Sequence, residues 1–568
     1  MDEKKNQEQI PEGSAPGKKY RKILIAVIAA AAVLSVGALA YVKMTARDPK
    51  EVVIEAFENV FPKDQIYPMD EIFGLKEMAE ASARTDSQGG VTLKIDSCSE
   101  EMINAYAGSG FRIAGRNDVT NGKADVNLCA VYSGMDLLNL NFYYGDKTLM
   151  CTVPELSGKV FSLDLGDGLA ERVENSPLLG PVVKEQGVDA AGVISFYADL
   201  LEEARQNAQE GKASFDVKAL WNRYKEGCRA QENFKAALTV EKGDKAIFTM
   251  DGKEVKARAY SVLISKASMI DFLRTSSDFF LQDETLKADF IKQLETAVKM
   301  SELMGGDPFD GMTAEEKQQQ TYDQAKEAAD EMISYLEEAL NDVQMNVYVD
   351  KEGRLCAFDA VTQITVKDEE TQEGEEKAAG EDEAVYVQIE CRFEGGAYLT
   401  QNMSLSVDLT DEDESVGLEL HRQGIYDGKQ LTCDISADLT SSQEGADGSL
   451  MYTGAYNLEN GDYHLTLEAS GNGEKVLAVS ALGAVDQLER GKSCHINMDE
   501  LKLTAADDTE NIVLSGECYW KPLEEEILPP EGEAMDVLAA TEDDWNGVMM
   551  EMVFGAMGLA GQLQTPGQ

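Results

Sequence analysis

Apolar and polar side chains alternate with a period of two through most of residues 344–521, and this alternation constrains the fold more than any other feature. In the run 383–393, one series is apolar: Val385, Val387, Ile389, Cys391 and Phe393. Successive side chains of a strand point to opposite faces of its sheet, so each run predicts a strand with one apolar face. Turn signals such as Asp427-Gly428 and Asn472-Gly473 separate the runs. The block is therefore predicted to be an antiparallel meander.

Further strands and helices are predicted outside this block from the same kind of pattern. Strands are expected at 91–97, 123–132, 137–153, 159–165, 234–242, 246–251 and 254–265. A turn at Gly243-Asp244 is expected to separate the strand at 234–242 from the strand at 246–251. The helical period predicts helices at 48–61, 69–84, within 166–230, twice between 266 and 343, and at 535–561. Asp48 is expected to be the N-cap of the first helix and Pro49 its first residue. In one of the two long helices, residues 322–343 carry an amphipathic stripe that ends with Leu336, Leu340 and Val343.

These patterns predict an α+β fold with one or more large, curved antiparallel β-meander sheets, helices packed on one face, and one preceding transmembrane helix. The expected divisions are a cytoplasmic tail (1–22), a membrane anchor (23–42), an N-terminal α+β lobe (48–230), a mostly antiparallel β lobe (231–521) with long helices at 266–343, and a C-terminal linker and amphipathic helix (522–568).

The anchor is predicted from an uncharged run between Ile23 and Val42, flanked by basic residues. Twenty helical residues span about 30 Å, one hydrocarbon thickness. Lys18, Lys19, Arg21 and Lys22 precede the run, which favours a single-pass cell-membrane protein with its N-terminus in the cytoplasm and its C-terminal domain outside. The alternative is a signal peptide cleaved after Ala40.

The charge balance argues against nucleic acid and anionic lipid surfaces as partners. Residues 1–47 hold eight Lys+Arg and four Asp+Glu, so the 43 basic and 100 acidic residues that remain give a net charge of −57. A field of that sign repels nucleic acid and anionic lipid surfaces, and we expect neither as a surface partner. The acidic run at 368–383 has no apolar period and is expected to be a solvated loop between two strands.

Few residues are arranged for catalysis or ligation. His421, His464 and His495 fall on the polar side of predicted strands, outside any metal-binding spacing. Gly491-Lys492-Ser493 resembles the end of a phosphate loop, but Asp486 stands in place of the earlier glycine. Asp411 begins a stretch that resembles a calcium loop, but Arg422 occupies the position of the bidentate glutamate. No catalytic, cofactor-binding or metal-binding residue is therefore assigned, and no cofactor is expected.

The nine cysteines form no C-x-x-C pair. Cys391, Cys433 and Cys518 are in phase with apolar neighbours, so they are predicted to be small buried hydrophobic residues. Cys98, Cys129 and Cys151 fall in successive predicted strands, and a disulfide among them is left open.

The C-terminal helix is expected to pack on the sheet through an apolar series that includes Trp545, Met549, Val553 and Met557. A methionine-rich lid over an apolar groove is the alternative, because methionine adapts to varied ligands.

Three segments carry a family resemblance: DPKEVVIEAFENVF (48–61), MDEIFGLKEM (69–78) and VYVDKEGRLCAFDA (347–360). With the anchor, they resemble a family of uncharacterised membrane-anchored proteins of anaerobic Gram-positive bacteria, described as a domain of unknown function. The strand–turn–strand pattern is also similar to that of lipoprotein-carrier half-barrels, in which a curved antiparallel sheet wraps apolar helices and holds an acyl chain. This second resemblance is one of fold alone and transfers no functional residue.

The expected function is that of a membrane-anchored, extracytoplasmic protein without enzymatic activity, which binds a lipid or other apolar ligand between sheet and helices. A cell-surface interaction or scaffold module and an envelope hydrolase are the alternatives. An apolar cavity lined by sheet residues would favour the first function, an exposed apolar patch the second, and a cleft of convergent carboxylates the third.

The anchor yields a direct prediction. A reporter enzyme fused after residue 60 is expected to be active only outside the cytoplasm, because the basic residues precede Ile23. Paired reporters, one active in the cytoplasm and one active outside it, make the measurement. Cytoplasmic activity of the fusion would reverse the predicted orientation.

Overall fold

The computed structural model describes residues 48–563, apart from 63–64, 83, 187–188, 211–215, 304–310, 367–382, 412–413, 443–446 and 507–509. The predicted tail and anchor lie outside these residues, as does most of the acidic run at 368–383. None of the helices that are described is both long and apolar enough to cross a membrane.

A single twenty-stranded sheet dominates the described part of the chain. Its spatial order, read from the hydrogen-bonded pairs, is β20, β6, β5, β4, β3, β2, β1, and then β19 down to β7 in reverse sequence order; only the β20–β6 pair is parallel. The strands are β1 (Ser87–Cys98), β2 (Gly110–Asp118), β3 (Lys123–Tyr132), β4 (Met135–Gly145), β5 (Thr148–Thr152), β6 (Lys159–Asp164), β7 (Thr239–Met250), β8 (Lys253–Ile264), β9 (Val343–Asp350), β10 (Leu355–Val366), β11 (Glu383–Gly395), β12 (Asn402–Thr410), β13 (Ser415–Tyr426), β14 (Gln430–Ser441), β15 (Gly448–Asn457), β16 (Asp462–Gly471), β17 (Glu474–Glu489), β18 (Ser493–Ala505), β19 (Asn511–Pro522) and β20 (Glu533–Asp536).

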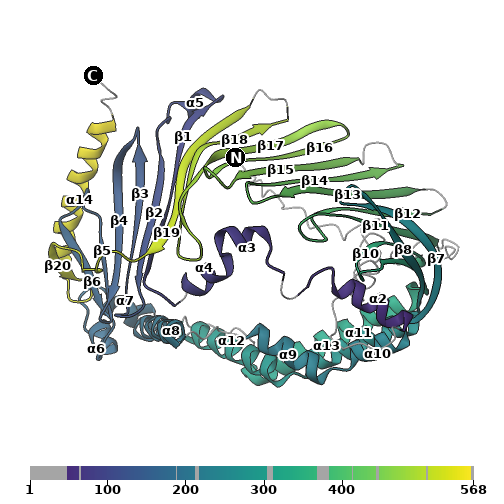
Figure 1. Ribbon diagram of the computed structural model, residues 1–568. Helices are drawn as coiled ribbons and strands as arrows, with labels where there is room; N and C mark the ends of the chain where they lie inside the picture. The colour runs from purple at the N-terminus through teal and green to yellow at the C-terminus, as the bar shows by residue number, and fades with distance from the viewer. Residues whose placement is uncertain are drawn as a thin grey trace, which may run out of the picture.

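The sheet bends into an arch, and a row of helices that includes α8 to α13 runs along its open side from the β6 end to the β7 end (Figure 1). Helices α3 and α4 lie inside the arch. The described helices are α2 (Pro49–Glu58), α3 (Pro68–Phe73), α4 (Leu75–Ser82), α5 (Glu101–Asn104), α6 (Leu169–Glu174), α7 (Leu179–Gln186), α8 (Ala190–Glu210), α9 (Val217–Gly227), α10 (Ala230–Ala237), α11 (Lys266–Gln282), α12 (Glu284–Leu303), α13 (Ala314–Ala339) and α14 (Glu542–Leu563).

The predicted α+β class and the large, mostly antiparallel sheet are confirmed. Strands from the two predicted lobes share this sheet, because β1 pairs with β19 along its length, from Ser87 opposite Pro522 to Cys98 opposite Ile512. Segments more than four hundred residues apart in the chain are thus neighbours in the sheet.

The largest core lies at the β7–β12 end, where α2, α11 and α13 cover the sheet. As predicted, Asp48 caps α2 by accepting a hydrogen bond from the Lys50 amide (3.2 Å), and Pro49 is the first helical residue. The Phe57 ring of α2 packs 5.5 Å from the ring of Phe358, which is fully buried on β10. The apolar stripe predicted at 322–343 is buried only near its end, at Leu336, Leu340 and Val343, while Met332 is exposed. Leu340 is the C-cap of α13, and Val343 is the first residue of β9.

Two predictions near this core are wrong. The strand predicted at 234–242 begins only at Thr239, as the first part of β7, because Ala230–Ala237 form α10, whose Phe234 ring packs 5.5 Å from the Phe272 ring. The predicted turn at Gly243-Asp244 lies inside β7, because a bulge between Lys242 and Lys245 absorbs the irregularity without ending the strand.

Among the described residues between 266 and 343 there are three long helices, where two were predicted. The break comes at Asp283, whose carboxylate accepts hydrogen bonds from the amides of Thr285 and Leu286 (both 3.0 Å) and so caps α12. The Arg223 guanidinium of α9 binds the same carboxylate at 3.1 Å, and its hydrogen bond is the main cause that lowers the pKa of Asp283.

The β10–β11 hairpin generates a prediction about the acidic run. Val366 is paired with Glu383 in the ladder, so deleting residues 369–382 leaves two residues to connect strands that are already adjacent. We expect the free energy of unfolding to change by less than about 1 kcal/mol, since the length of a surface loop affects stability weakly. Urea denaturation measures the change. The Phe358→Ala variant, expected to lose about 3–5 kcal/mol, is the positive control. A loss as large in the deletion variant would show that the acidic run is structural.

Candidate functional site

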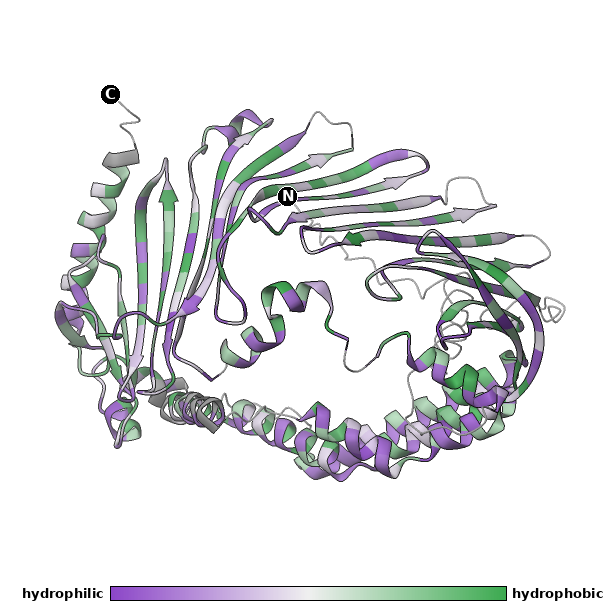
Figure 2. Ribbon diagram, viewed as in Figure 1, coloured by the Kyte–Doolittle hydropathy of each residue, from purple (hydrophilic) through white to green (hydrophobic). Residues whose placement is uncertain are grey.

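One face of the sheet is apolar across most of its width. Directly opposed residues of an antiparallel ladder have their side chains on the same face. The pairs Leu418–Leu439, Leu450–Ala469 and Val479–Leu503 continue this face from β13 to β18, and Leu514–Ile95, Val91–Ile113 and Val126–Phe142 continue it from β19 to β4. We call this the inner face. Figure 2 shows the corresponding alternation of apolar and polar bands along the strands.

Coverage of the inner face differs between its two ends. In β9 to β11 the inner-face side chains Val347, Phe358 and Ile389 are buried beneath helices. In contrast, Leu450 of β15 is 46% exposed and Ile113 of β2 is 44% exposed. An exposed apolar surface of this extent is typical of a binding groove or an interaction surface in a folded protein.

A cavity of about 700 Å³ lies where α3 faces the inner face between β13 and β18. Its volume is typical of a small-ligand site. Aliphatic and aromatic side chains dominate the lining, which consists of Tyr67, Pro68, Met69, Phe73, Tyr398, Arg422, Leu431, Cys433, Tyr452, Gly454, Ala455, Tyr456, Tyr463, Leu465, Ala481, Val485, Ile496 and Met498. The polar groups are tyrosine hydroxyls, one thiol and one guanidinium.

Helix α3 is held over the sheet by the turn between β17 and β18. Gly74 ends α3 in the left-handed conformation (φ 63°), so the 69–84 segment forms two short helices where one was predicted. The Gly491 amide donates a hydrogen bond to the Phe73 carbonyl (3.0 Å). The Arg490 guanidinium donates to the Glu71 carbonyl (2.9 Å) and forms an ion pair with Glu77 (2.9 Å).

Aromatic contacts complete the attachment of α3. The Phe73 ring packs 5.5 Å from the Tyr456 ring on the inner face. At the other end of the helix, the Tyr67 ring meets the edge of Tyr398 at 5.3 Å. Burial raises the pKa values of Tyr398, Tyr456 and Tyr463. These hydroxyls therefore remain neutral at physiological pH. The Tyr463 hydroxyl donates to the Asn497 carbonyl (3.3 Å), whereas the Tyr398 hydroxyl accepts a hydrogen bond from Arg422 and can still donate one to a ligand.

Arg422, on β13, contributes the positive charge of the cavity. Its Nη2 donates a hydrogen bond to the Tyr398 hydroxyl (2.8 Å), and its guanidinium carbon lies 5.6 Å from the centre of that ring. In the sequence, Arg422 stands out only as a mismatch to a calcium loop. The signal that could have identified it is its phase: it follows Val416, Leu418 and Leu420 in the apolar series of β13.

The glycine-rich turn and the three histidines considered in the sequence are not part of the cavity lining. Gly491-Lys492-Ser493 belongs to the turn that holds α3. His421 and His464 are exposed, in register positions opposite to the inner face. His495 also lies on the outer face; burial alone would lower its pKa, but hydrogen bonds to Asp486 and to Glu517 (3.2 Å) raise it above its usual value. Within the described part of the chain, no cluster of three or more potential metal ligands occurs.

All nine cysteines are described, and none is in a disulfide. Cys391 is buried as predicted, and burial raises its pKa to about 12. Cys433 is half-buried in the lining of the cavity, whereas Cys518 is exposed, contrary to the prediction. Cys129 is opposite Asn139 of β4, and Cys151 is opposite Phe142 of the same strand. Odd and even positions of a strand point to different faces, so the two thiols lie on different faces of the sheet.

The C-terminal helix packs through a different side from the one predicted. Residues Met535 and Asp536 belong to β20, and α14 begins at Glu542. Trp545 stacks on Phe161 of β6 at 5.8 Å, and Val548 is buried beside them (1% exposed). Val553 is 44% exposed, as part of an outward apolar side that also contains Met549, Met550, Phe554 and Met557.

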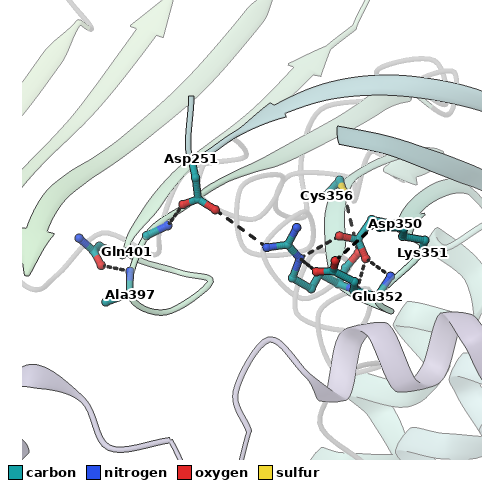
Figure 3. A network of polar contacts seen from close by, with 9 residues as sticks. Asp251, Asp350, Lys351, Glu352, Cys356, Ala397 and Gln401 are labelled. Atoms are coloured by element: carbon teal, nitrogen blue, oxygen red, sulfur yellow. Dashed lines mark hydrogen bonds and ion pairs between the residues drawn. The ribbon is translucent and has the colours of Figure 1, made fainter. Parts of the chain in front are cut away.

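A polar network joins neighbouring turns at the β7–β12 end of the sheet (Figure 3). The Asp350 carboxylate is 1% exposed and accepts hydrogen bonds from the amides of Glu352 (2.8 Å) and Arg354 (2.9 Å) and from the Arg354 guanidinium (2.8 Å). Asp251, at the β7–β8 turn, accepts a hydrogen bond from the Gly396 amide (2.8 Å). These carboxylates are engaged in fixing three turns, and burial raises the pKa of the neighbouring Cys356 to about 11. The network is therefore structural.

Comparisons with known proteins returned no similar family model, no similar curated protein and no similar solved structure. The inner face and the cavity beneath α3 are therefore the features that bear on function.

The attachment of α3 can be tested at Gly74. A Cβ atom at this position would lie 2.7 Å from the Gly491 backbone nitrogen, in addition to the cost of a side chain at φ +63°. We expect Gly74→Ala to loosen α3 by about 1–3 kcal/mol, which hydrogen exchange would detect as faster exchange over residues 67–82. Gly428→Ala is the matched control, since Gly428 also has positive φ (83°) but nothing within 4 Å of its Cβ position. Equal behaviour of the two variants would contradict the proposed docking contact.

Proposed function

We propose that this protein binds the acyl chain of a lipid in the cavity between α3 and the inner face of the sheet. The observation that supports the proposal most strongly is the combination of a cavity of about 700 Å³ with a lining that is almost wholly apolar. Burying each methylene group in such a site contributes about 0.8 kcal/mol. A long aliphatic chain is therefore the ligand class that gains most from this surface.

The extent of the inner face supports a chain-like ligand. The apolar face continues from the cavity across β19 and β1 to β4, where its side chains are partly exposed. A rigid, compact ligand would use only the part beneath α3. A flexible chain can follow the inner face beyond α3.

The proposed activity is non-enzymatic binding. The predicted anchor would place the cavity outside the cytoplasm beside a membrane, where acyl lipids are abundant. Among the described lining residues there is no carboxylate, so the envelope hydrolase expected as an alternative gains no support from this cavity.

The interaction or scaffold function is supported by a separate observation. The outward side of α14 exposes Met549, Met550, Val553, Phe554 and Met557. Since this helix packs on β6, away from the strands β13 to β18 that line the cavity, lipid binding in the cavity and contact with a protein partner would use separate surfaces.

A cavity-filling substitution tests the proposal. Ala481 of β17 lines the cavity, so Ala481→Trp is expected to weaken binding of a fluorescent fatty acid by about tenfold or more, because excluding two methylene groups costs about 1.6 kcal/mol. Ala478→Trp is the matched control, since Ala478 lies on the same strand and is paired with Glu468 on the outer face. Fluorescence titration gives both Kd values, and thermal unfolding checks that the variants fold. No binding by the unaltered chain, or equal binding by both variants, would contradict the proposal.

A further inference from the structure

An arginine in the apolar series of a sheet requires a physical explanation. Arg422 of β13 is paired with Met403 of β12 and Ile435 of β14, so the side chains beside it on the inner face are apolar. Transferring a charged group to such surroundings is costly unless a partner compensates it. Arg422 is half-buried in the lining of the cavity, so water or a ligand in the cavity can bind the donors that the protein leaves exposed.

The partners found in the described structure do not neutralise this charge. A guanidinium has five N–H donors. For Arg422 the described acceptor is the Tyr398 hydroxyl, at 2.8 Å from Nη2. Its Nε is buried and, within the described part of the chain, has no hydrogen-bond partner. Tyr398 is itself a neutral group, since burial raises its pKa.

Four arginines in or beside the sheet differ in this respect, whereas the described partner of Arg258 on β8 is a carbonyl, that of Gly243 (3.2 Å). Arg112 binds Asp136 (2.7 Å), Arg354 binds Asp350 (2.8 Å), and Arg116 and Arg392 form ion pairs with Asp125 and Asp359. The chain contains 104 acidic residues, yet none of the described residues that line this cavity is acidic. An acidic chain that leaves one cavity cation without a carboxylate has a site into which an external anion fits.

We propose that the ligand is an anionic amphiphile, whose carboxylate or phosphate group binds Arg422 while its acyl chain lies on the inner face. This inference rests on the proposed lipid-binding function and specifies the head group. The planar guanidinium suits an oxyanion because it offers parallel donors from two nitrogens. The Tyr398 hydroxyl and the nearby Tyr67 belong to the same end of the cavity.

The dimensions of the site agree with this arrangement. The lining extends from Arg422 on β13 to Ile496 and Met498 on β18. Five inter-strand steps of about 4.8 Å give about 24 Å. A chain whose head group binds Arg422 therefore has room to run across the strands beneath α3.

The test compares matched ligands on the full chain. Hexadecanoic acid, monohexadecyl phosphate, hexadecanol and inorganic phosphate each compete with a photoactivatable hexadecanoic acid, and peptide mass spectrometry quantifies the label on residues 415–505. The variants are Arg422→Gln, Arg422→Lys and, as a control for net charge, Arg274→Gln, whose side chain is exposed on α11 and pairs with Glu337.

We expect the two anionic amphiphiles to compete about 10- to 100-fold better than hexadecanol, the range for hydrogen bonds to a charged group. Arg422→Gln should remove this preference while hexadecanol binding is unchanged. Arg422→Lys should retain part of the preference, and Arg274→Gln should retain all of it. Thermal unfolding confirms that each variant is folded.

Other outcomes overturn the inference in distinguishable ways. Equal competition by hexadecanol and the anionic amphiphiles would remove the head-group assignment and leave lipid binding intact. Competition by inorganic phosphate at the same concentration as the amphiphiles would assign Arg422 to a free anion. Failure of every amphiphile to displace the label, or absence of label on residues 415–505, would remove the proposed function and this inference together.

Discussion

The structure depends on strand register, which keeps the apolar series of each strand aligned with that of its neighbours. A shift of one residue in any pair would move an entire apolar series to the opposite face. The bulges in β17 and β18 interrupt the ladder locally, at Leu482/Gly483 and at Met498/Leu501, but Val479 and Leu503 remain opposed beyond them. Register therefore maintains one apolar surface over strands from both halves of the chain.

That surface is used differently along the arch. At the β7–β12 end, α2, α11 and α13 bury it and form the main core. Under α3 the coverage is incomplete, because a helix of six residues contacts the sheet through Phe73 and the β17–β18 turn while a cavity remains beside it. The stable end can support the fold while the sparsely covered part is available to a ligand. Arg422 adds a charge to a surface whose register neighbours are otherwise apolar.

The sequence predicted local structure better than it predicted contacts. Alternation identifies the strands around Val387 and Ile435, because apolar and polar residues alternate strictly along each of them and place one apolar and one polar face on the sheet. A short apolar segment such as the one around Phe234 fits both the strand period of two and the helical period of 3.6, and the strand predicted there is wrong. Packing of the Phe234 ring against Phe272 stabilises the helix instead. The pairing of β1 with β19 could not be predicted, since local pattern carries no information about which distant strands meet.

The candidate site shows the same limit. A lipid site between sheet and helices was expected from the pattern, but its position depends on the docking of Gly74 against Gly491, which are separated by most of the chain. On α14 the spacing of Trp545, Met549 and Val553 suggested one buried stripe, whereas contact with Phe161 buries Trp545 together with Val548. Helical period gives candidate faces, and the tertiary partner decides which of them is buried.

The central claim is that the cavity beneath α3 holds an acyl chain. Native mass spectrometry of the full chain, purified directly from the cells that produce it, tests this claim most directly. We expect a bound species whose fragmentation releases an acyl chain, at about one per protein molecule. A ligand-free mass that persists after incubation with acyl lipids would contradict it.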